Sequence, residues 1–181
     1  HQLHRRQRQM CIRDRIPTDG DDQLTNPRAA MNTMDGWSTT MPIVLNFKGE
    51  GFATGTLASG VSVIKINQRL TDWDGASNPI SEVLTINQDF VVQANGNSLY
   101  IQFADALDES SEYVFAVTQE VNDVNGDPIG TSSSYAVAKS KEVKYETGDL
   151  ALVQAATTGI EGIFGIATQA GLANVNPADI V

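Results

Sequence analysis

Short apolar runs separated by clusters of Asn, Asp, Gly and Pro dominate the first two thirds of the sequence, and this pattern limits the fold more than any other feature. Its clearest example is the stretch "QDFVVQANGNSLYIQF", in which two β-rich runs, Phe90–Gln93 and Leu99–Phe103, flank Asn95-Gly96. Asn-Gly is a favoured corner for a two-residue β-hairpin because both positions tolerate positive φ. We therefore predict a hairpin with its corner at Asn95-Gly96.

Other runs with strand character follow the same spacing. In the run 61–67 the apolar residues alternate with polar ones, but this alternation shifts by one residue between Val63 and Ile64. Such a shift favours a β-bulge there. The run 112–119 has apolar residues on both faces, as expected of a central strand. The further predicted strands are 43–47 and 61–67, and a short apolar stretch lies at 83–86. Short strands at this spacing predict a mainly β fold, an immunoglobulin-like β-sandwich.

Helical patterns are confined to the two ends of the domain. A short N-terminal helix is predicted over 27–34, with Asn26 as its cap and Pro27 as its first residue. The segment 134–142 favours a second short helix, and an Ala- and Gly-rich helix is expected from Asp149, which is a plausible cap. Its predicted apolar stripe is Leu152, Ala155, Ala156, Gly159, Ile163 and Ile166.

Three glycines in that last helix, Gly159, Gly162 and Gly165, recur every third residue. Each weakens a helix by about 1 kcal/mol relative to Ala. Their common spacing suggests a helix face packed tightly on another element. No uninterrupted apolar run in the sequence is long enough to cross a membrane.

The first fifteen residues differ in composition from the rest. They hold five Arg against Asp14, a net charge of +4, within a chain of net charge −10. They also contain both His and the single Cys, and their "MCIRDR" end resembles translated sequencing-adapter read-through. We therefore divide the chain into a tail foreign to the domain, 1–15, and one domain, 16–181, incomplete at its C-terminus. The alternative is a native basic arm that binds an anionic membrane or RNA.

The charge balance of 16–181 excludes one class of partner. With the tail removed, the domain carries a net charge of −14. Binding to nucleic acid needs clustered Lys and Arg to neutralise phosphates, so nucleic acid is not expected as a partner.

Catalytic chemistry finds little support in the residues after Arg15. They contain no His and no Cys, and no G-x-S-x-G motif raises a serine on a sharp turn. Ser77 and Ser132 come nearest, both in ordinary turn composition. Two pairs of acidic residues, Asp72 with Asp74 and Asp105 with Asp108, are interpreted as surface charge. We predict no catalytic residues and no cofactor site.

One acidic loop, "DVNGDP", begins like a calcium loop, with Asp123, Asn125 and Asp127 at alternate positions. An EF-hand is excluded because its sixth position is Pro128 and its twelfth is Ser134. A looser calcium site at a sandwich rim and an Asx-rich β-turn both stay open. We assign no metal ligand.

Two segments carry a resemblance to a known family. "NPRAAMNTMDGWSTTMPIVLNF" and "FADALDESSEYVFAVTQEVNDVNGDPIGTSSSYAVAKS" are similar to stretches of the bacterial virulence-factor lipase N-terminal domain, found ahead of the α/β-hydrolase in Pla/Cef-type extracellular lipases. The Asp-Gly-Trp-Ser-Thr-Thr string is the most specific element. Physically, we expect Trp37 to anchor this entry segment in the core, while the hydroxyls of Ser38, Thr39 and Thr40 bond to backbone. The family's usual Pro before the Tyr strand is Glu109 here.

The resemblance implies a non-catalytic accessory domain of an extracellular or outer-membrane lipase of a Gram-negative bacterium, often a lipoprotein. Its partner would be the α/β-hydrolase domain of the same parent chain, with membrane lipid as a further contact through that domain. The alternative is a stand-alone immunoglobulin-like adhesion module. The family's final strand would follow "NPADIV", so we expect an uncovered sheet edge and an uncovered face of the last helix.

Overall fold

The chain divides into two compact units, His1–Ser38 and Thr39–Val181, and the fold described below is that of the second. The predicted tail 1–15, the predicted helix 27–34 and Trp37 lie outside the described residues. The computed structural model of the chain describes the following residues: Gln23, Thr25, 38–140 and 142–181.

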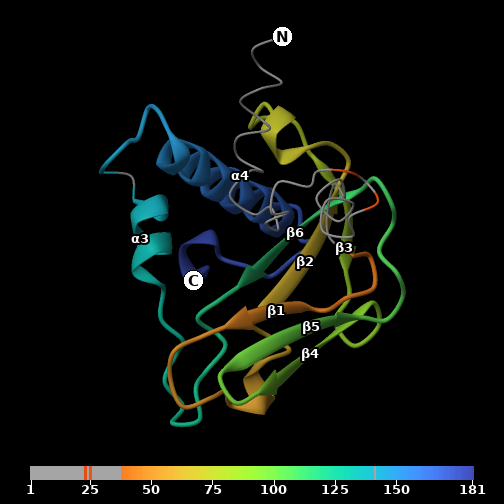
Figure 1. Cartoon of the computed structure of the whole chain (residues 1–181), viewed down its shortest axis with the longest axis vertical. Helices are drawn as coiled ribbons and strands as arrows, with labels where there is room; N and C mark the ends of the chain where they lie inside the picture. Colours follow the sequence, from red (N-terminus) through yellow and green to blue (C-terminus); the bar gives the residue numbers. More distant parts are fainter. Residues whose placement is uncertain (1–22, 24, 26–37, 141) are drawn as a thin grey trace. The chain divides into compact units, whose positions relative to one another are not determined.

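Two antiparallel sheets of three strands each make up the β-part of the described chain (Figure 1), which confirms the mainly β prediction. One sheet has the order β1-β5-β4 and the other the order β3-β2-β6. The strands are β1 (Ile43–Asn46), β2 (Val61–Ile66), β3 (Ile80–Leu84), β4 (Phe90–Asn95), β5 (Ser98–Phe103) and β6 (Glu112–Val117).

The predicted hairpin is present as β4 and β5, but its corner lies one residue later than predicted. The ladder continues to Asn95 opposite Ser98, so the corner is Gly96-Asn97. Gly96 has a φ of 58°, whereas Asn97 is not among the residues with positive φ. One positive φ at the first corner position is the pattern of a type II′ turn, which places Gly there. The glycine, and not the preceding asparagine, therefore sets the register.

The central strand of the second sheet is β2, and the prediction that 112–119 is central was wrong. β6 lies at the end of the strand order and pairs with β2 alone among the six strands. Both strands are apolar on two faces because their sheet has a hydrophobic cluster on either side. Val63 faces one cluster and Ile64 the other, and both side chains are fully buried. This two-sided burial accounts for the phase slip that was interpreted as a bulge.

A register irregularity does occur, but two residues later and on the side of β3. Lys65 pairs with Glu82 and Ile66 with Ile80, so β3 carries one extra residue, Ser81. On its other side β2 pairs with β6 without interruption.

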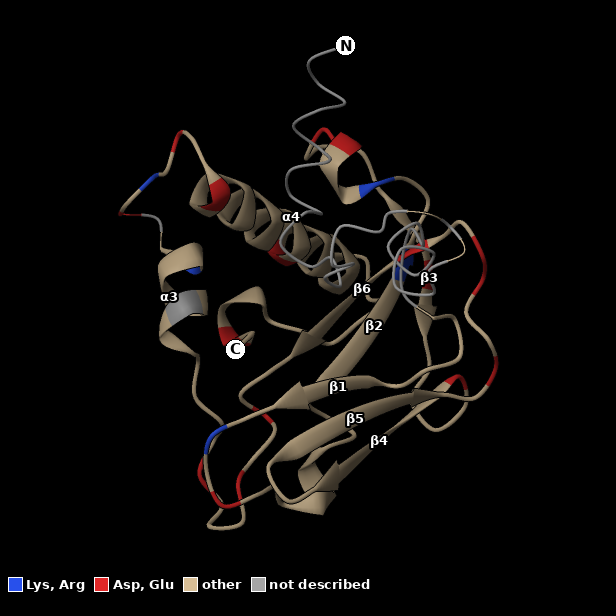
Figure 2. Cartoon of the chain, in the orientation of Figure 1, with Lys and Arg blue, Asp and Glu red and all other residues tan. Residues whose placement is uncertain are grey.

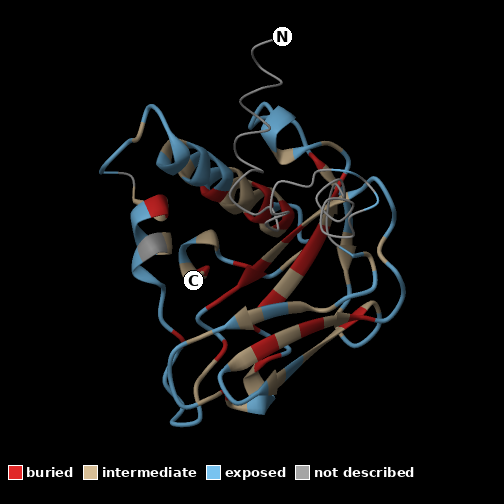
Figure 3. Cartoon of the chain, viewed as in Figure 1, coloured by how far each residue is buried: buried red, intermediate tan, exposed pale blue. Residues whose placement is uncertain are grey.

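The domain has three layers: the β1-β5-β4 sheet, the β3-β2-β6 sheet, and a long helix, α4 (Asp149–Gln169), on the outer face of the second sheet (Figure 3). Phe90, Leu99 and Ile101 fill the space between the sheets together with residues of β2. Ile163 and Phe164 of α4 pack on the other face of β2. Burying each such side chain stabilises the fold by about 1.5–3 kcal/mol.

Shorter helices connect these layers. The helix predicted over 134–142 is present as α3 (Ser133–Lys139). The cap of α4 is Gly148, not Asp149, which is the first helical residue; Gly148 has a φ of 81° and makes no side-chain bond. In the first turn, Asp149 still favours the helix through its charge near the positive end of the dipole. The 3-10 helices are η2 (Thr54–Thr56), η3 (Leu70–Asp72) and η4 (Pro177–Asp179).

The apolar stripe predicted for α4 was wrong in its first half. Leu152, Ala155 and Ala156 are exposed, because only the second half of the helix lies on the sheet (Figure 3). The buried residues are Thr157, Ile163, Phe164 and Ala167.

The prediction of a tightly packed glycine face on α4 is confirmed. A Cβ at Gly159 would lie 2.9 Å from Leu70, and one at Gly162 would lie 3.0 Å from Trp73. The third glycine, Gly165, faces Pro177 at 3.6 Å. The glycines thus allow η3 and η4 to approach the helix closely.

By length and composition alone, α4 could cross a membrane: it has 21 residues, and its most apolar window has a mean hydropathy of 1.4. The predicted absence of an uninterrupted apolar run of that length is not contradicted, because Gln154, Thr157 and Glu161 interrupt the apolar residues of α4. Its Ile163 and Phe164 are nevertheless fully buried against the sheet, which accounts for part of its apolar composition.

Candidate functional site

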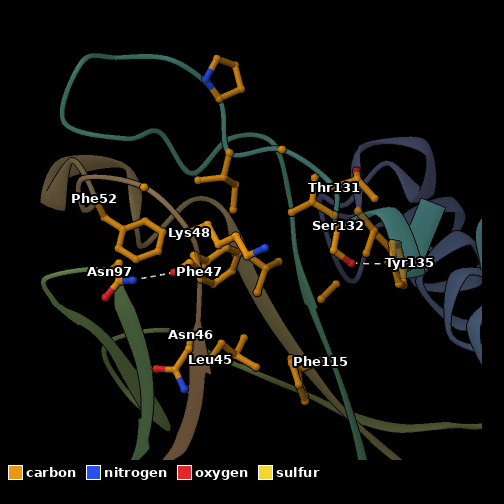
Figure 4. A pocket seen from close by; sticks show the side chains of 18 of the residues that line it. Leu45, Asn46, Phe47, Lys48, Phe52, Asn97, Phe115, Thr131, Ser132 and Tyr135 are labelled. Carbon is orange, nitrogen blue, oxygen red and sulfur yellow. Dashed lines mark hydrogen bonds between the residues drawn. The ribbon is translucent and has the colours of Figure 1, made fainter.

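A groove of about 970 Å³ lies between β1 and β6, the facing edge strands of the two sheets (Figure 4). On one side it is lined by Leu45 in β1 and by Phe47, the residue after β1. On the other side it is lined by Phe115 in β6. Tyr135 of α3 and Val181 also belong to its lining.

The wall on the β1 side is held by the loop that follows β1. Asn97 Nδ2 donates to the carbonyl of Phe47 at 2.6 Å, and the Phe47 N–H donates to the Asn97 carbonyl at 2.9 Å. The rings of Phe47 and Phe52 meet edge to face with centroids 5.2 Å apart. A Cβ at Gly51 would lie 3.0 Å from the Gly96 carbonyl, so glycine is needed where this loop passes the hairpin corner. The loop is therefore fixed against β4 and β5.

The opposite wall is formed by α3. Ser132 caps this helix, and its Oγ accepts from the Tyr135 N–H at 3.1 Å (Figure 4). Burial raises the pKa of Tyr135 to about 12, with a smaller contribution from the charge of Glu161. The Tyr135 phenol is therefore neutral at physiological pH.

Lys139, at the end of α3, holds the last residues of the chain in place. Its Nζ donates to three carbonyl oxygens, those of Pro177 at 3.0 Å, Ala178 at 2.9 Å and Ile180 at 2.9 Å. It also forms an ion pair with Glu161 at 3.4 Å. We call Lys139 with the segment 177–181 the C-terminal anchor.

The C-terminal anchor is joined to the end of β6. Thr118 and Ile180 form an antiparallel bridge, the Gln119 N–H donates to the Asp179 carbonyl at 2.9 Å, and the Val181 N–H donates to the Val117 carbonyl at 2.9 Å. Ile180 is 3% exposed and packs between the sheet and α4. The end of the chain therefore already runs beside β6.

The serines considered as nucleophiles have structural contacts. Ser132 is the cap of α3. Ser77 donates through its backbone N–H and its Oγ to Asp74 Oδ1, at 2.8 Å each. The Asp74 carboxylate is a weak base, because the hydrogen bonds that it accepts lower its pKa to about 2.

The first pair of acidic residues that was interpreted as surface charge has definite contacts. Asp74 accepts hydrogen bonds from the backbone of Ser77 and Ala76 and from the Ser77 hydroxyl, which lower its pKa to about 2. Asp72 accepts from the Thr71 hydroxyl at 3.4 Å. These carboxylates hold the turn in which they lie.

The second acidic pair lies on the surface beside β2. Asp108 forms an ion pair with Lys65. Asp105 borders a small surface hollow of about 170 Å³ beside Asp108. Figure 2 shows that acidic residues are frequent in the loops and turns.

The loop that begins like a calcium site is built as an Asx turn. Asp123 Oδ1 accepts from the N–H groups of Asn125 at 2.8 Å and Asp127 at 3.0 Å, and these backbone bonds lower the pKa of Asp123. Gly126 takes the positive φ, 88°, that the turn requires. No group of three or more His, Cys, Asp or Glu that could hold a metal occurs among the described residues.

The segment that leads into β1 is held by a backbone hydrogen bond. The Leu107 N–H donates to the carbonyl of Thr39 at 2.9 Å, and this bond fixes the chain just before the strand. The hydroxyl–backbone bonds expected for Ser38, Thr39 and Thr40 stay a prediction.

Sequence reasoning missed both the groove and the C-terminal anchor. The contacts of Lys139 join residues that are far apart in the chain, so no local pattern marks them. The one available signal was the apolar pair Ile180-Val181 after a short polar stretch, which has the composition of an incipient strand.

Comparison with known proteins gives a single kind of match. No curated protein sequence and no solved structure matches the chain. A family model does, under the description bacterial virulence factor lipase N-terminal, and its match spans residues 13–177. Because that span is nearly the whole chain, the chain belongs to the bacterial virulence factor lipase N-terminal family.

Proposed function

We propose that this chain is a non-catalytic N-terminal accessory domain of a bacterial lipase that acts outside the cell or at its surface. The observation that carries the proposal is the family match over residues 13–177. In this proposal an α/β-hydrolase domain of the same parent chain cleaves lipid or phospholipid esters, and this domain helps to fold or position it.

The contacts of the candidate residues support a structural role. Ser132 caps a helix, and Asp74 and Asp123 accept backbone hydrogen bonds in turns. Side chains engaged in this way hold the local backbone and do not converge on a substrate. The groove between β1 and β6 is lined mostly by apolar residues, and two carboxylates at its border, Glu112 and Asp123, accept backbone hydrogen bonds. This arrangement suits packing better than acid–base chemistry, which needs titratable groups held at the reacting atoms.

The partner in this proposal is the hydrolase domain, with membrane lipid reached through it. The outer surface of a Gram-negative bacterium is the proposed location. The acidic composition, a net charge of −10, disfavours nucleic acid as a partner.

We also propose that residues 16–181 form one domain, which begins three residues after the start of the family match, and that 1–15 are a tail foreign to it. The immunoglobulin-like sandwich belongs to the same proposal. Two antiparallel sheets that enclose an apolar cluster support it, although the described part has three strands in each sheet. A constant-type immunoglobulin domain has seven in total.

Two measurements test the function. The purified chain is incubated with p-nitrophenyl esters of short and long acyl chains, and we expect no turnover above the buffer blank. The gene downstream of Val181 is then sequenced, and we expect a long segment that contains a G-x-S-x-G motif.

Either measurement can overturn the proposal. Ester cleavage by the purified chain that co-elutes with it and disappears on heating would make it an enzyme. Further immunoglobulin-like repeats downstream, without a nucleophile motif, would instead favour the adhesion module. The family match favours the lipase over that alternative.

A further inference from the structure

The groove between β1 and β6 is long enough for an extended hydrocarbon chain. All the residues of β6, Glu112–Val117, belong to its lining. At about 3.3 Å per residue they span about 20 Å, which is the length of an extended saturated acyl chain of about sixteen carbons. The volume of the groove, about 970 Å³, lies within the usual range of small-molecule sites, about 300–1,000 Å³.

The surface that borders this space is mostly hydrocarbon. Leu45, Phe47 and Phe115 lie along the groove (Figure 4), and each is only partly buried in the cluster between the sheets. Phe52 and Ile129 also belong both to the lining and to that cluster. An apolar ligand in the groove would therefore extend the hydrophobic core, and each methylene group that it removes from water would strengthen binding.

One positive charge accompanies this apolar lining. Lys48 is the only Lys, Arg or His among the described residues that line the groove. Figure 4 shows its side chain pointing from the β1 side into the groove, in the direction of Thr131. Neither of the two ion pairs found among the described residues includes Lys48. A cation placed in this way beside an apolar groove selects a ligand that carries an anionic group at one end.

The acidic residues of the lining leave the Lys48 charge available. Glu112 accepts from the Leu70 N–H at 3.2 Å, and Asp123 accepts from the Asp127 N–H at 3.0 Å, so both carboxylates are held by backbone. The third, Glu50, is exposed, and water and salt screen its charge. The groove thus combines an apolar length with one available cation, which complements a carboxylate at the end of an acyl chain.

We propose that the groove between β1 and β6 binds a long-chain fatty acid. The hydrocarbon chain lies along β6, over Phe115 and between it and the side chains of Leu45 and Phe47. The carboxylate pairs with the Lys48 ammonium. Thr131, on the facing side, offers a hydroxyl that can donate to the second carboxylate oxygen.

The ligand class connects this site with the proposed function. A fatty acid is the acid that the parent lipase would release from an ester, so a site for it in the accessory domain would take up product beside the hydrolase. This use of the site rests on the proposed function. The binding itself depends only on the groove and on Lys48.

The test is a calorimetric titration of the purified chain with octanoate, decanoate and laurate, each at concentrations at which it is monomeric. We expect one site per chain. Affinity should rise about threefold to fourfold with each added methylene group, because each is buried in the groove. Decanol has the chain of decanoate with a neutral head and should bind at least about tenfold more weakly, because it lacks the charge that pairs with Lys48.

Substitution of Lys48 separates the charge from the apolar groove. Lys48→Met keeps an unbranched side chain but removes the ammonium, so decanoate should bind at least about tenfold more weakly. Decanol should bind this variant within about twofold of the wild-type affinity, which also shows that the groove is intact. Lys144→Met is the matched control, because Lys144 is exposed and does not line the groove, and it should leave both affinities unchanged.

The position of the ligand is read from amide chemical shifts. On addition of decanoate the amides of Phe47 and Phe115 should shift, because both residues line the groove. The amide of Val91 in β4 should not shift, because Val91 does not line the groove.

Four results would overturn the proposal. The first is the absence of saturable binding of laurate to the wild-type chain. The second is decanol binding as tightly as decanoate, since the charge would then play no part. The third is an equal loss of decanoate affinity in the Lys48 and Lys144 variants, since net charge would be responsible. The fourth is a set of shifts confined to the exposed leucines of α4, Leu150 and Leu152, since the ligand would then adsorb to the helix.

The outcome is independent of that of the proposed function. None of these measurements requires ester hydrolysis. If the chain binds fatty acids but no hydrolase is encoded downstream, the site stands and its proposed use fails. If a hydrolase is encoded but no fatty acid binds, the accessory role stands and the site fails.

Discussion

The two outer edges of the β3-β2-β6 sheet differ in how they meet solvent. At one edge, β3 carries an extra residue, Ser81, beside the exposed and charged Glu82. At the other edge, β6 pairs with β2 without a bulge, and none of its residues is exposed. Bulges and charges are the usual means by which proteins prevent edge strands from pairing with other chains. β3 therefore has the features of a protected edge, and β6 lacks both of them.

The two edges also differ in the range of the contacts that hold them. The loop before β3 is fixed by neighbours, since Asp74 accepts from Ser77 and the Trp73 indole N–H donates to the Ser77 carbonyl at 2.8 Å. The end of β6 is fixed by the C-terminal anchor, in which Ile180, from the far end of the chain, bridges to Thr118. A local arrangement can form as soon as its own loop exists, whereas the anchor needs the whole domain. Substitutions on the β6 side should therefore cost more.

The largest effect is expected at Ile180, whose side chain is 3% exposed between the sheet and α4. Ile180→Ala should lower the free energy of unfolding by about 2–5 kcal/mol through lost burial and the cavity that remains. Urea denaturation followed by circular dichroism measures it. Leu172→Ala is the matched control, because Leu172 is largely exposed. Its truncation should have little effect, as is usual for surface substitutions. Equal losses in the two variants would contradict the importance of the anchor.

Lys139 should come next. Lys139→Met keeps most of the side-chain volume but removes the donor to three carbonyl oxygens and leaves Glu161 without its ion pair. We expect a loss of about 1–3 kcal/mol, the cost of leaving partly buried acceptors unsatisfied. The exposed Lys144→Met serves as the control and should have little effect. The Gln119 amide, which donates to Asp179, should exchange faster only in the Lys139 variant. A stable variant with unchanged exchange would show that burial of Ile180 alone holds the segment.

A smaller effect on stability is expected on the protected edge. Glu82 lies opposite Lys65 across the strands, and Glu82→Val removes this opposite-charge pair, worth about 0.2–1 kcal/mol. It also adds a β-branched apolar residue to an exposed edge, so light scattering at fixed protein concentration should rise. Glu120→Val makes the same charge change in a turn outside the strands and should scatter less. If both variants aggregate equally, net charge and not edge protection is responsible.

The contrast between local and long-range contacts also separates the features that the sequence predicts from those that it does not. Features set by neighbouring residues were predictable: the β4–β5 hairpin, the short helix α3 and the close approach allowed by Gly159 and Gly162. Even there, the hairpin corner lies one residue later than predicted, because of its two residues only Gly96 has a positive φ.

Features that depend on packing between segments far apart in the chain were not predictable. Apolar residues on both faces suited β2 and β6 equally, and only the packing of α4 on one side and a second sheet on the other decides which strand is central. The stripe on α4 failed because helical periodicity does not say how much of a helix reaches the sheet, and Leu152 lies beyond it. The groove itself is made by two edges, β1 and β6, the first and the last strand of the described chain. Contacts between such distant segments leave no mark in a local pattern.

The smallest effect concerns pH and the loop that leads into β3. Asp74 has its pKa lowered to about 2 in the folded chain by hydrogen bonds from Ser77 and Ala76, against an ordinary value of 3.8. Because the folded carboxyl binds its proton less readily than the unfolded one, it stabilises the fold fully above pH 4, and this contribution is lost as the pH falls toward 2. Asp74→Asn should therefore flatten the pH dependence of the melting temperature between pH 4 and pH 2. Ser77→Ala, which removes the hydroxyl donor, should raise the folded pKa of Asp74, so the fall becomes smaller and ends at a higher pH. A wild-type slope in Asp74→Asn would mean that acid sensitivity arises elsewhere, and the short-range bonds before β3 would then be as dispensable to the domain as their exposure suggests.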